Sequence, residues 1–412
     1  MRASYAAALL AAVMTTAAPA QEVLIRNAKI YTVSDGVRDG ADVLVRDGKI
    51  VAIGEKVKAS AGATPIDAHG QPLTPGIFGG LSQIGAVEIS AESSTADASL
   101  TFRGPDAEQQ WRPEFDITLA FDAQSTLVPV ARIEGITWTM LTPGEGSAIM
   151  SGQGAAVTLD GRQDAVFPDT HALFVSLGID GKRLAGGSRA GLYMLLDQAI
   201  REARSKAPFG EYDLLHPAGR EVLARYLSGG HVVFNVERAS DILEVISYAR
   251  KQGIKPVVVG GSEAWRVAKE LATAHVPVVL NPLRDLPYEF EQLGSRLDNA
   301  ALLQRAGVLI AFSPDDGHNA RTIRQLAGNA VAHGLAWDEA LAAITRNPAE
   351  IFGLGATHGR IAIGQSADLV LWDGDPLEVT TSATQVWING RPIEMRSRQT
   401  ELRDRYLKAA AR

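Results

Sequence analysis

The chain has 412 residues, with 47 acidic and 40 basic side chains and a formal net charge of −7. This balance leaves no basic surface for nucleic acid, and no run of lysine or arginine indicates an anionic membrane, so small molecules or proteins are the expected partners. The sequence has no cysteine, which excludes disulfides and thiolate metal ligands; any metal must be held by His, Asp or Glu.

The first twenty residues predict a secretory signal peptide. Arg2 provides a basic start, residues 6–13 form a short apolar run, and residues 18–20 read Ala-Pro-Ala, a small-residue cleavage site. We therefore expect residues 1–20 to be removed, and the mature chain to work in the periplasm or outside the cell. No later segment supplies the roughly 20 consecutive apolar residues of a transmembrane helix, so no membrane span is expected.

Short strands and tight turns predict β-structure at both ends of the mature chain. The N-terminal part contains the dipeptides Asp35-Gly36 and Asp47-Gly48, and the C-terminal part contains Asn389-Gly390, all typical of hairpin turns. Either part alone would leave strand edges exposed. Residues 21–75 and 358–395 are therefore expected to form one composite β-sandwich. The apolar runs lie at 23–25, 28–33, 41–45, 49–53, 368–372 and 385–388.

Between these ends, residues 76–357 show strands that alternate with helices. Apolar runs at 232–236, 256–259, 276–280 and 308–312 are each followed or separated by helical patterns, which Ser240, Ser262 and Asp298 are expected to begin. The alternation predicts parallel βα units of the α/β class. The segment is close to the roughly 250 residues of a TIM-type (β/α)8 barrel, which is favoured over an open doubly wound sheet.

Two segments fall outside this alternation. The polar stretch 88–124 is expected to be an insertion over one mouth of the barrel. The charged tail 396–412 is expected to form a solvated amphipathic helix, with docking onto a partner subunit as the alternative.

In a parallel barrel, reactive groups gather where the strands end. The ends of three predicted strands carry Asn235, Asn281 and the segment Ser313–His318, which contains Asp315 and His318. Carboxylates beside an imidazole suit proton transfer or cation binding, although Asp and Gly after a strand also form ordinary turns. We expect Asp315 to be catalytic and His318, Asn235 and Asn281 to bind substrate.

Both ends of the chain resemble the amidohydrolase superfamily, most closely its imidazolonepropionase-like and dipeptidase-like branches. The closing segments are Asn347–Leu354 and Gly359–Val370, the latter reading G-R-I-A-I-G-Q-S-A-D-L-V; the opening ones are Gly48–Gly54 and Leu73–Gly76. The resemblance implies the barrel with its terminal β-sandwich. It also implies metal-dependent hydrolysis of carbon–nitrogen bonds other than peptide bonds.

The metal motif of that family is altered in the first barrel strand. The family reads Pro-Gly-x-x-Asp-x-His-x-His, whereas here Gly79 stands at the Asp position and Leu81 and Gln83 at the two His positions. Leu has no lone pair, and Gln offers only a neutral oxygen, which binds zinc poorly. Gln83 is instead expected to contact substrate.

The later ligands of the family are also replaced. Asn235 stands where one histidine is usual, and Gly260 or Gly261 stands where the other is, so only Asp315 matches a family ligand. Zinc normally needs three or four protein donors. The cofactor is therefore expected to be at most one divalent metal, zinc or manganese, with a metal-free site as the alternative.

Two functions stay open. In the first, the chain is an exported hydrolase of cyclic or linear amides, with Asp315 as general base or sole metal ligand and with His318, Asn235 and Gln83 orienting substrate or water. In the second, it is a non-catalytic homologue that binds a ligand or serves as partner subunit of an active paralogue. The oligomer is accordingly expected to be a homo-oligomer or a heteromer with a paralogous amidohydrolase.

Overall fold

The computed structural model describes residues 22–100, 110–144, 148–315 and 317–410. The expected signal peptide, residues 1–20, lies outside this range. No helix within it is both long and apolar enough to cross a membrane.

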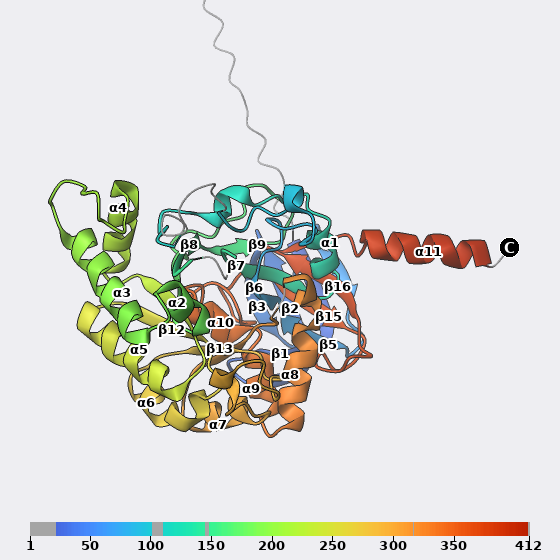
Figure 1. Ribbon diagram of the computed structural model, residues 1–412. Coiled ribbons are helices and arrows are strands. Elements are labelled where there is room, and N and C mark those ends of the chain that lie inside the picture. Colours follow the sequence, from blue (N-terminus) through green and yellow to red (C-terminus); the bar gives the residue numbers. More distant parts are fainter. Residues whose placement is uncertain (1–21, 101–109, 145–147, 316, 411–412) are drawn as a thin grey trace, which may run out of the picture.

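Strands from both ends of the chain form one eight-stranded sheet (Figure 1). Its order is β17-β16-β15-β5-β1-β2-β3, and β4 also pairs with β1. The two ends join where β5 runs antiparallel to β15, with Leu73 opposite Leu371. The bounds are β1 (Glu22–Tyr31), β2 (Val37–Arg46), β3 (Lys49–Gly54), β4 (Thr64–Asp67), β5 (Pro72–Pro75), β15 (Leu369–Trp372), β16 (Ala383–Ile388) and β17 (Arg391–Pro392).

Turn chemistry explains why these strands reverse where they do. Asp47 and Gly48 adopt φ values of +50° and +76°, and Asn389 and Gly390 adopt +50° and +72°, which are left-handed conformations that Asp, Asn and Gly tolerate. The two turns pack against each other, because a Cβ on Gly390 would lie 2.8 Å from Gly48 Cα. The pairing of the two chain ends in one sheet agrees with the sequence; the two-layered sandwich stays a prediction.

The larger part of the molecule contains two further sheets. A six-stranded sheet has the order β14-β13-β12-β11-β10-β8, and a three-stranded sheet has the order β6-β7-β9. Strands β10 to β14 are parallel, as are β6 and β7. The bounds are β6 (Ile77–Ser82), β7 (Ile136–Leu141), β8 (Met150–Gly154), β9 (Ala156–Thr158), β10 (Ala172–Ser176), β11 (His231–Val236), β12 (Lys255–Gly260), β13 (Val278–Leu280) and β14 (Ile310–Phe312).

These two sheets share one apolar core. It contains at least one residue from each of β6, β7 and β9 to β14, together with four from the end of α10 and the turn after it. On one side the sheets are joined by the chain itself, since residues 150–158 run through β8 into β9. On the other side Leu81 N donates to Ser313 Oγ at 2.9 Å, next to β14. The members are Phe78, Trp138, Met140, Ala156, Ala172, Val233, Val257, Val279, Ala311, Ala349, Ile351, Phe352 and Leu354.

The expected eightfold parallel barrel is therefore confirmed only in its coarser features. The segment 150–158 is antiparallel to both of its neighbours, β10 and β7, and the described residues between β7 and β8, 142–144 and 148–149, form no helix. The four strands predicted in the second half are present as β11 to β14, each running parallel to the next.

The helices surround these sheets, and two expected helix starts are wrong. Ser240 does not cap α5, because that helix begins one residue earlier, with Arg238 at the N-cap; Ser262 donates to Glu237 instead of capping. Ser188 does cap α3, accepting from Gly191 N. The bounds are α1 (Leu127–Arg132), α2 (Ile179–Leu184), α3 (Arg189–Arg204), α4 (Pro217–Tyr226), α5 (Ala239–Gln252), α6 (Ala268–Thr273), α7 (Asn299–Arg305), α8 (Ile323–Ala332), α9 (Trp337–Ala342), α10 (Arg346–Ile351) and α11 (Arg398–Ala410), with single 3-10 turns η1 (Ser93–Thr95), η3 (Ile117–Ala120), η4 (Ala264–Val267), η5 (Phe290–Gln292) and η6 (Gly317–Thr322).

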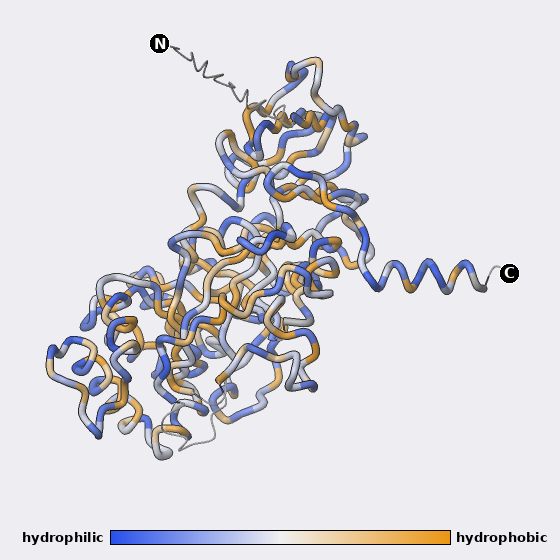
Figure 2. Tube along the Cα trace, turned by 90° about the horizontal axis from the view of Figure 1, so that it is seen from above, coloured by the Kyte–Doolittle hydropathy of each residue, from blue (hydrophilic) through white to orange (hydrophobic). Residues whose placement is uncertain are grey.

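The C-terminal helix α11 points away from the rest of the molecule in both views (Figures 1 and 2). Its side chains from Gln399 to Lys408 are exposed or half-buried, including Leu402 and Tyr406. The sequence predicts a helix here; whether it is solvated or docks onto a partner subunit stays a prediction.

Candidate functional site

A cavity of about 450 Å³ opens where the parallel strands end, the position at which parallel barrels carry their sites. Its walls come mainly from residues at or just after the ends of seven strands and from the loop between β13 and α7. The strand-end residues are Leu81, Ser82 and Gln83 at β6, Thr142 and Pro143 after β7, Ser176 and Gly178 at β10, Asn235 and Glu237 at β11, Gly260 and Ser262 at β12, Leu280 and Asn281 at β13, and Ser313, Pro314 and Asp315 after β14.

The structure brings four of the five expected site residues together. Gln83, Asn235, Asn281 and Asp315 all line this cavity, although 232 residues separate the first from the last in the sequence. The fifth, His318, belongs to η6, and its side chain lies outside the described part of the structure. The roles assigned to these residues stay predictions.

Asp315 is held by two neighbours. Arg284 Nη2 donates to Asp315 Oδ1 at 2.7 Å, and Asn281 Nδ2 donates to Oδ2 at 3.0 Å. Asn281 is itself oriented, because its Oδ1 accepts from Leu283 N at 3.0 Å. Both oxygens of the Asp315 carboxylate therefore have a donor, while half of the side chain is exposed to the cavity and solvent.

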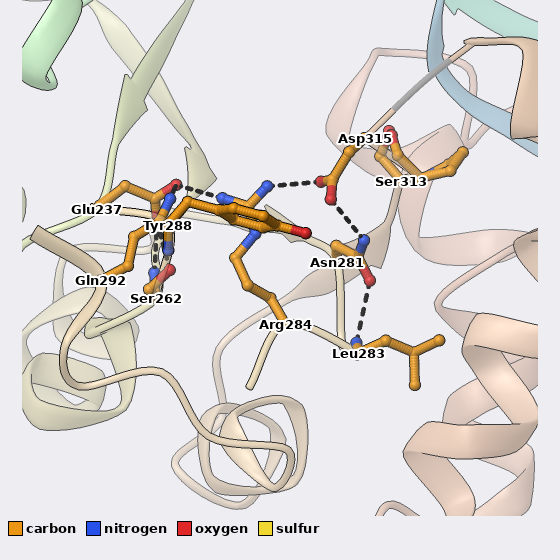
Figure 3. A network of polar contacts seen from close by, with 10 residues as sticks. Glu237, Ser262, Asn281, Leu283, Arg284, Tyr288, Gln292, Ser313 and Asp315 are labelled. Atoms are coloured by element: carbon orange, nitrogen blue, oxygen red, sulfur yellow. Dashed lines mark hydrogen bonds and ion pairs between the residues drawn. The ribbon is translucent and has the colours of Figure 1, made fainter. Parts of the chain in front are cut away.

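The same arginine also reaches a buried carboxylate. Arg284 Nη1 donates to Glu237 Oε1 at 2.8 Å, so its guanidinium bridges Glu237 and Asp315 (Figure 3). Glu237 further accepts from the backbone N and the hydroxyl of Ser262, at 2.8 and 2.6 Å, and from Gln292 Nε2 at 3.2 Å. Charge-assisted bonds of this kind fix the position of a carboxylate.

One glycine makes room for this network. Gly260 has φ +88°, and a Cβ there would lie 2.7 Å from Glu237 Oε1. Any side chain would therefore both strain the backbone and displace the carboxylate. Gly260 is one of the two glycines, with Gly261, expected at the histidine position of the family, and the packing of Glu237 requires that Gly260 has no side chain.

Sequence reasoning missed Arg284 and Gln292 as site residues. Both belong to the loop between β13 and α7, which carries no periodic pattern. Arg284 follows Asn281 by three residues, and only the path of the loop turns its guanidinium back over the strand ends. A basic residue close behind a strand end was the one available signal.

The donor set does not fit a zinc or manganese ion. Within the described ranges, no three residues of the types His, Cys, Asp and Glu lie close enough together to hold a metal. The two carboxylates that face each other across the mouth, Glu237 and Asp315, are joined by a guanidinium, and a cation beside them opposes the approach of a second one. We therefore derive no chemical step through a metal.

The described histidines lie away from the cavity. His231 is the first residue of β11, at the opposite end of the strand, and burial lowers its pKa. His171 lies 3.4 Å from Asp116, and His358 lies 3.9 Å from Asp368. His69 is in an exposed turn. None of them lines the cavity.

Comparison with known proteins gives a consistent result. A family model described as "Amidohydrolase family" matches residues 216–393. The solved structure of an amidohydrolase from Thermotoga maritima MSB8 is 26% identical, covers 91% of this chain and 100% of its own, and has a TM-score of 0.80. The N-isopropylammelide isopropylaminohydrolase structure from Burkholderia multivorans, at 15% identity, 90% and 98% coverage and TM-score 0.53, supports the fold alone.

Curated relatives match only short segments. Amidohydrolase tasK of Hapsidospora irregularis is 42% identical over 72 residues, which are 18% of this chain and 7% of that protein. The imidazolonepropionase of Chromobacterium violaceum is 45% identical over 85 residues, 19% of this chain and 21% of the enzyme. The match thus covers a small part of the length of either relative.

Proposed function

This chain belongs to the amidohydrolase superfamily, and on that basis we propose that its cavity binds a small molecule with an amide or lactam group, without metal-dependent hydrolysis. The ligand class follows from the superfamily and from the primary amides of Gln83 and Asn235 in the wall. A primary amide both donates and accepts, so it pairs with another amide in either direction.

The Arg284 bridge is the observation that supports binding over hydrolysis. Asp315, the one residue that matches a family metal ligand, receives Arg284 on one oxygen and Asn281 on the other. A guanidinium keeps its proton throughout the physiological range and acts only as a donor. It supplies a fixed positive charge and hydrogen bonds, which suit recognition of a polar ligand.

Hydrolysis of a non-peptide carbon–nitrogen bond is the second candidate. It is favoured by the exposed position of the Asp315 carboxylate at the cavity. In this reaction Asp315 takes a proton from water as the water oxygen adds to the amide carbonyl carbon. Asp315 then returns that proton to the nitrogen as the C–N bond breaks, which leaves a carboxylic acid and an amine. Gln83 and Asn235 would orient the amide.

Two measurements on the purified full chain separate these candidates. The first is calorimetric binding of ε-caprolactam and hexanamide, with and without a chelator. The second is metal analysis of protein purified without chelator, with the calorimetry samples checked for hydrolysis products. We expect binding that the chelator does not change, no stoichiometric zinc or manganese, and no hydrolysis products by mass spectrometry. Arg284→Met should weaken binding, while Arg162→Met, in an exposed ion pair outside the cavity, should not.

Other outcomes would overturn the proposal. Stoichiometric metal that is lost in Asp315→Asn, or turnover that Asp315→Asn abolishes, would support the hydrolase instead. Unchanged binding in Arg284→Met would show that the bridge has no part in recognition.

We further propose that the chain is exported, that its six-stranded and three-stranded sheets close as a distorted eight-stranded barrel, and that it assembles with itself or a paralogous amidohydrolase. Export is supported by the apolar run at 6–13 and the Ala-Pro-Ala site, and closure by the shared core of the two sheets. N-terminal sequencing of protein from the periplasmic fraction tests export, with Gln21 as the expected first residue.

A further inference from the structure

Two buried oxygen atoms in the cavity wall have no hydrogen-bond partner among the described residues. Glu291 is 3% exposed; its Oε1 pairs with Arg189, whereas its Oε2 is unpaired. Asn299 is 5% exposed; its Nδ2 donates to Gly261 O at 3.0 Å, which leaves its Oδ1 unpaired. Both residues line the cavity. Since an unpaired buried acceptor is costly, these oxygens indicate a ligand that supplies N–H donors.

The unpaired oxygen of Glu291 lies beside a glycine of the cavity wall. A Cβ built on Gly178 would lie 3.6 Å from Glu291 Oε2 and 3.9 Å from Asn235 O. Gly178 also lines the cavity, so the unpaired oxygen lies next to the cavity wall. Oε2 has almost no exposed surface, and a ligand therefore reaches it through a small shift of the Glu291 side chain past Gly178. The φ of Gly178, −70°, suits any residue, but its ψ of −155° lies just past the extended region, so alanine there adds a small backbone strain besides filling the space.

Negative charge dominates the described wall of the cavity. Five acidic residues line it, Asp180, Glu237, Glu289, Glu291 and Asp315, against one basic residue, Arg284. Behind the wall, Arg183 pairs with Asp180, and Arg189 pairs with both Glu291 and Asp241, so the carboxylates still outnumber the arginines. The single guanidinium of Arg284 serves both Glu237 and Asp315, so that pair keeps one negative charge in excess. A concave site lined by one sign of charge attracts ligands of the opposite sign.

We infer that this cavity selects ligands that carry an ammonium or guanidinium group, which donates to Glu291 Oε2. The inference rests on the proposed binding function and narrows its ligand to cationic amides. Glu291 is the specific contact because only its Oε1 is paired, with Arg189, and its buried Oε2 has no partner among the described residues. Both oxygens of Glu237 already accept, from Arg284 and Gln292 on Oε1 and from Ser262 on Oε2.

Three amides of similar size but different charge test this inference by calorimetry. They are 5-aminopentanamide, a cation; hexanamide, which is neutral; and glutaramate, an anion. We expect the cation to bind about tenfold more tightly than hexanamide, and glutaramate to bind most weakly. The preference should fall as salt is added, because ions screen the negative wall.

Two variants test the residue itself. Glu291→Gln keeps the shape and an acceptor for Arg189 but removes the charge, and should abolish the preference for the cation. The control Asp285→Asn removes one charge from the same loop, at an exposed position that does not line the cavity, and should keep it. Gly178→Ala leaves all charges in place but fills the space beside Oε2. It should weaken the binding of the cation more than the binding of hexanamide.

The outcomes separate this inference from the proposed function. If none of the three amides binds, both fail. If all three bind equally well, the binding function stands and the selection of cations is wrong. If Asp285→Asn lowers the preference as much as Glu291→Gln, the general negative field is responsible and Glu291 is not the contact. Should Glu291→Gln fail to fold, the response of Gly178→Ala decides.

Discussion

The guanidinium of Arg284 donates to the carboxylate of Asp315 at 2.7 Å, across the mouth of the strand-end cavity. Asp315 is the residue that the sequence aligned with a metal ligand, and here its cationic partner is a side chain of the same chain. A positive charge is thus built into the site. Removal of this charge should lower the free energy of unfolding as well as the affinity for the ligand.

Arg284→Met should destabilise the protein by about 2–3 kcal/mol, since it leaves the buried Glu237 carboxylate without its cation. The cost stays below that of a fully buried pair because Asp315 is half exposed. Urea unfolding followed by circular dichroism measures the change. Arg162→Met, whose ion pair is exposed on the arginine side, should cost less than about 1 kcal/mol; equal losses in the two variants would contradict the structural role of the bridge.

Gly260→Ala should lower the free energy of unfolding more than a substitution that introduces backbone strain alone. The new Cβ would lie 2.7 Å from Glu237 Oε1 at a φ of +88°, so strain and collision add to about 3 kcal/mol. Gly307→Ala is the matched control, since Gly307 has φ +87° and nothing within 4 Å of a Cβ; it should cost about 1–2 kcal/mol. The two free energies of unfolding come from parallel urea titrations. Equal values would mean that the Glu237 side chain moves aside without loss of stability.

Thr74→Val should loosen the junction between the two ends of the chain. Trp372 Nε1 donates to Thr74 Oγ1 at 2.9 Å, and both residues are fully buried. Valine keeps the shape but leaves the indole N–H unpaired, which costs about 1–3 kcal/mol. Thr64→Val, at an exposed position of β4 in the same sheet, should change stability by less than about 0.5 kcal/mol. Thermal unfolding of both variants measures these changes. If Thr74→Val loses no more stability than the control, the Trp372–Thr74 hydrogen bond does not stabilise the junction.

Stability should fall below pH 6.5, in part through His231. Burial, and then repulsion by Lys255, lower its pKa from 6.5. The unfolded chain therefore binds the proton more readily than the folded one. The contribution of neutral His231 to the free energy of unfolding is complete above pH 6.5. It is lost as the pH falls from 6.5 through the lowered pKa of the folded state. In urea titrations across this range, His231→Gln should show a shallower decline than wild type, whereas exposed His69→Gln should follow wild type; a slope unchanged in His231→Gln would show that this histidine does not contribute.

The sequence by itself determined the strands and turns whose residues carry local preferences. Asp47-Gly48 and Asn389-Gly390 reverse the chain because these residues tolerate left-handed backbone. Unbroken apolar runs gave β11 to β14, and strand ends identified Asn235, Asn281 and Asp315 as neighbours, since parallel strands end on the same side.

Only the tertiary structure decided which groups meet. The antiparallel course of residues 150–158 depends on pairing with strands before and after it in the chain, and no local pattern encodes that direction. Ser262 donates to Glu237 rather than capping a helix because the carboxylate lies within reach only after β11 and β12 pair. Arg284 reaches Glu237 and Asp315 from an irregular loop, so the central cation of the site came from the folded arrangement and not from the order of residues.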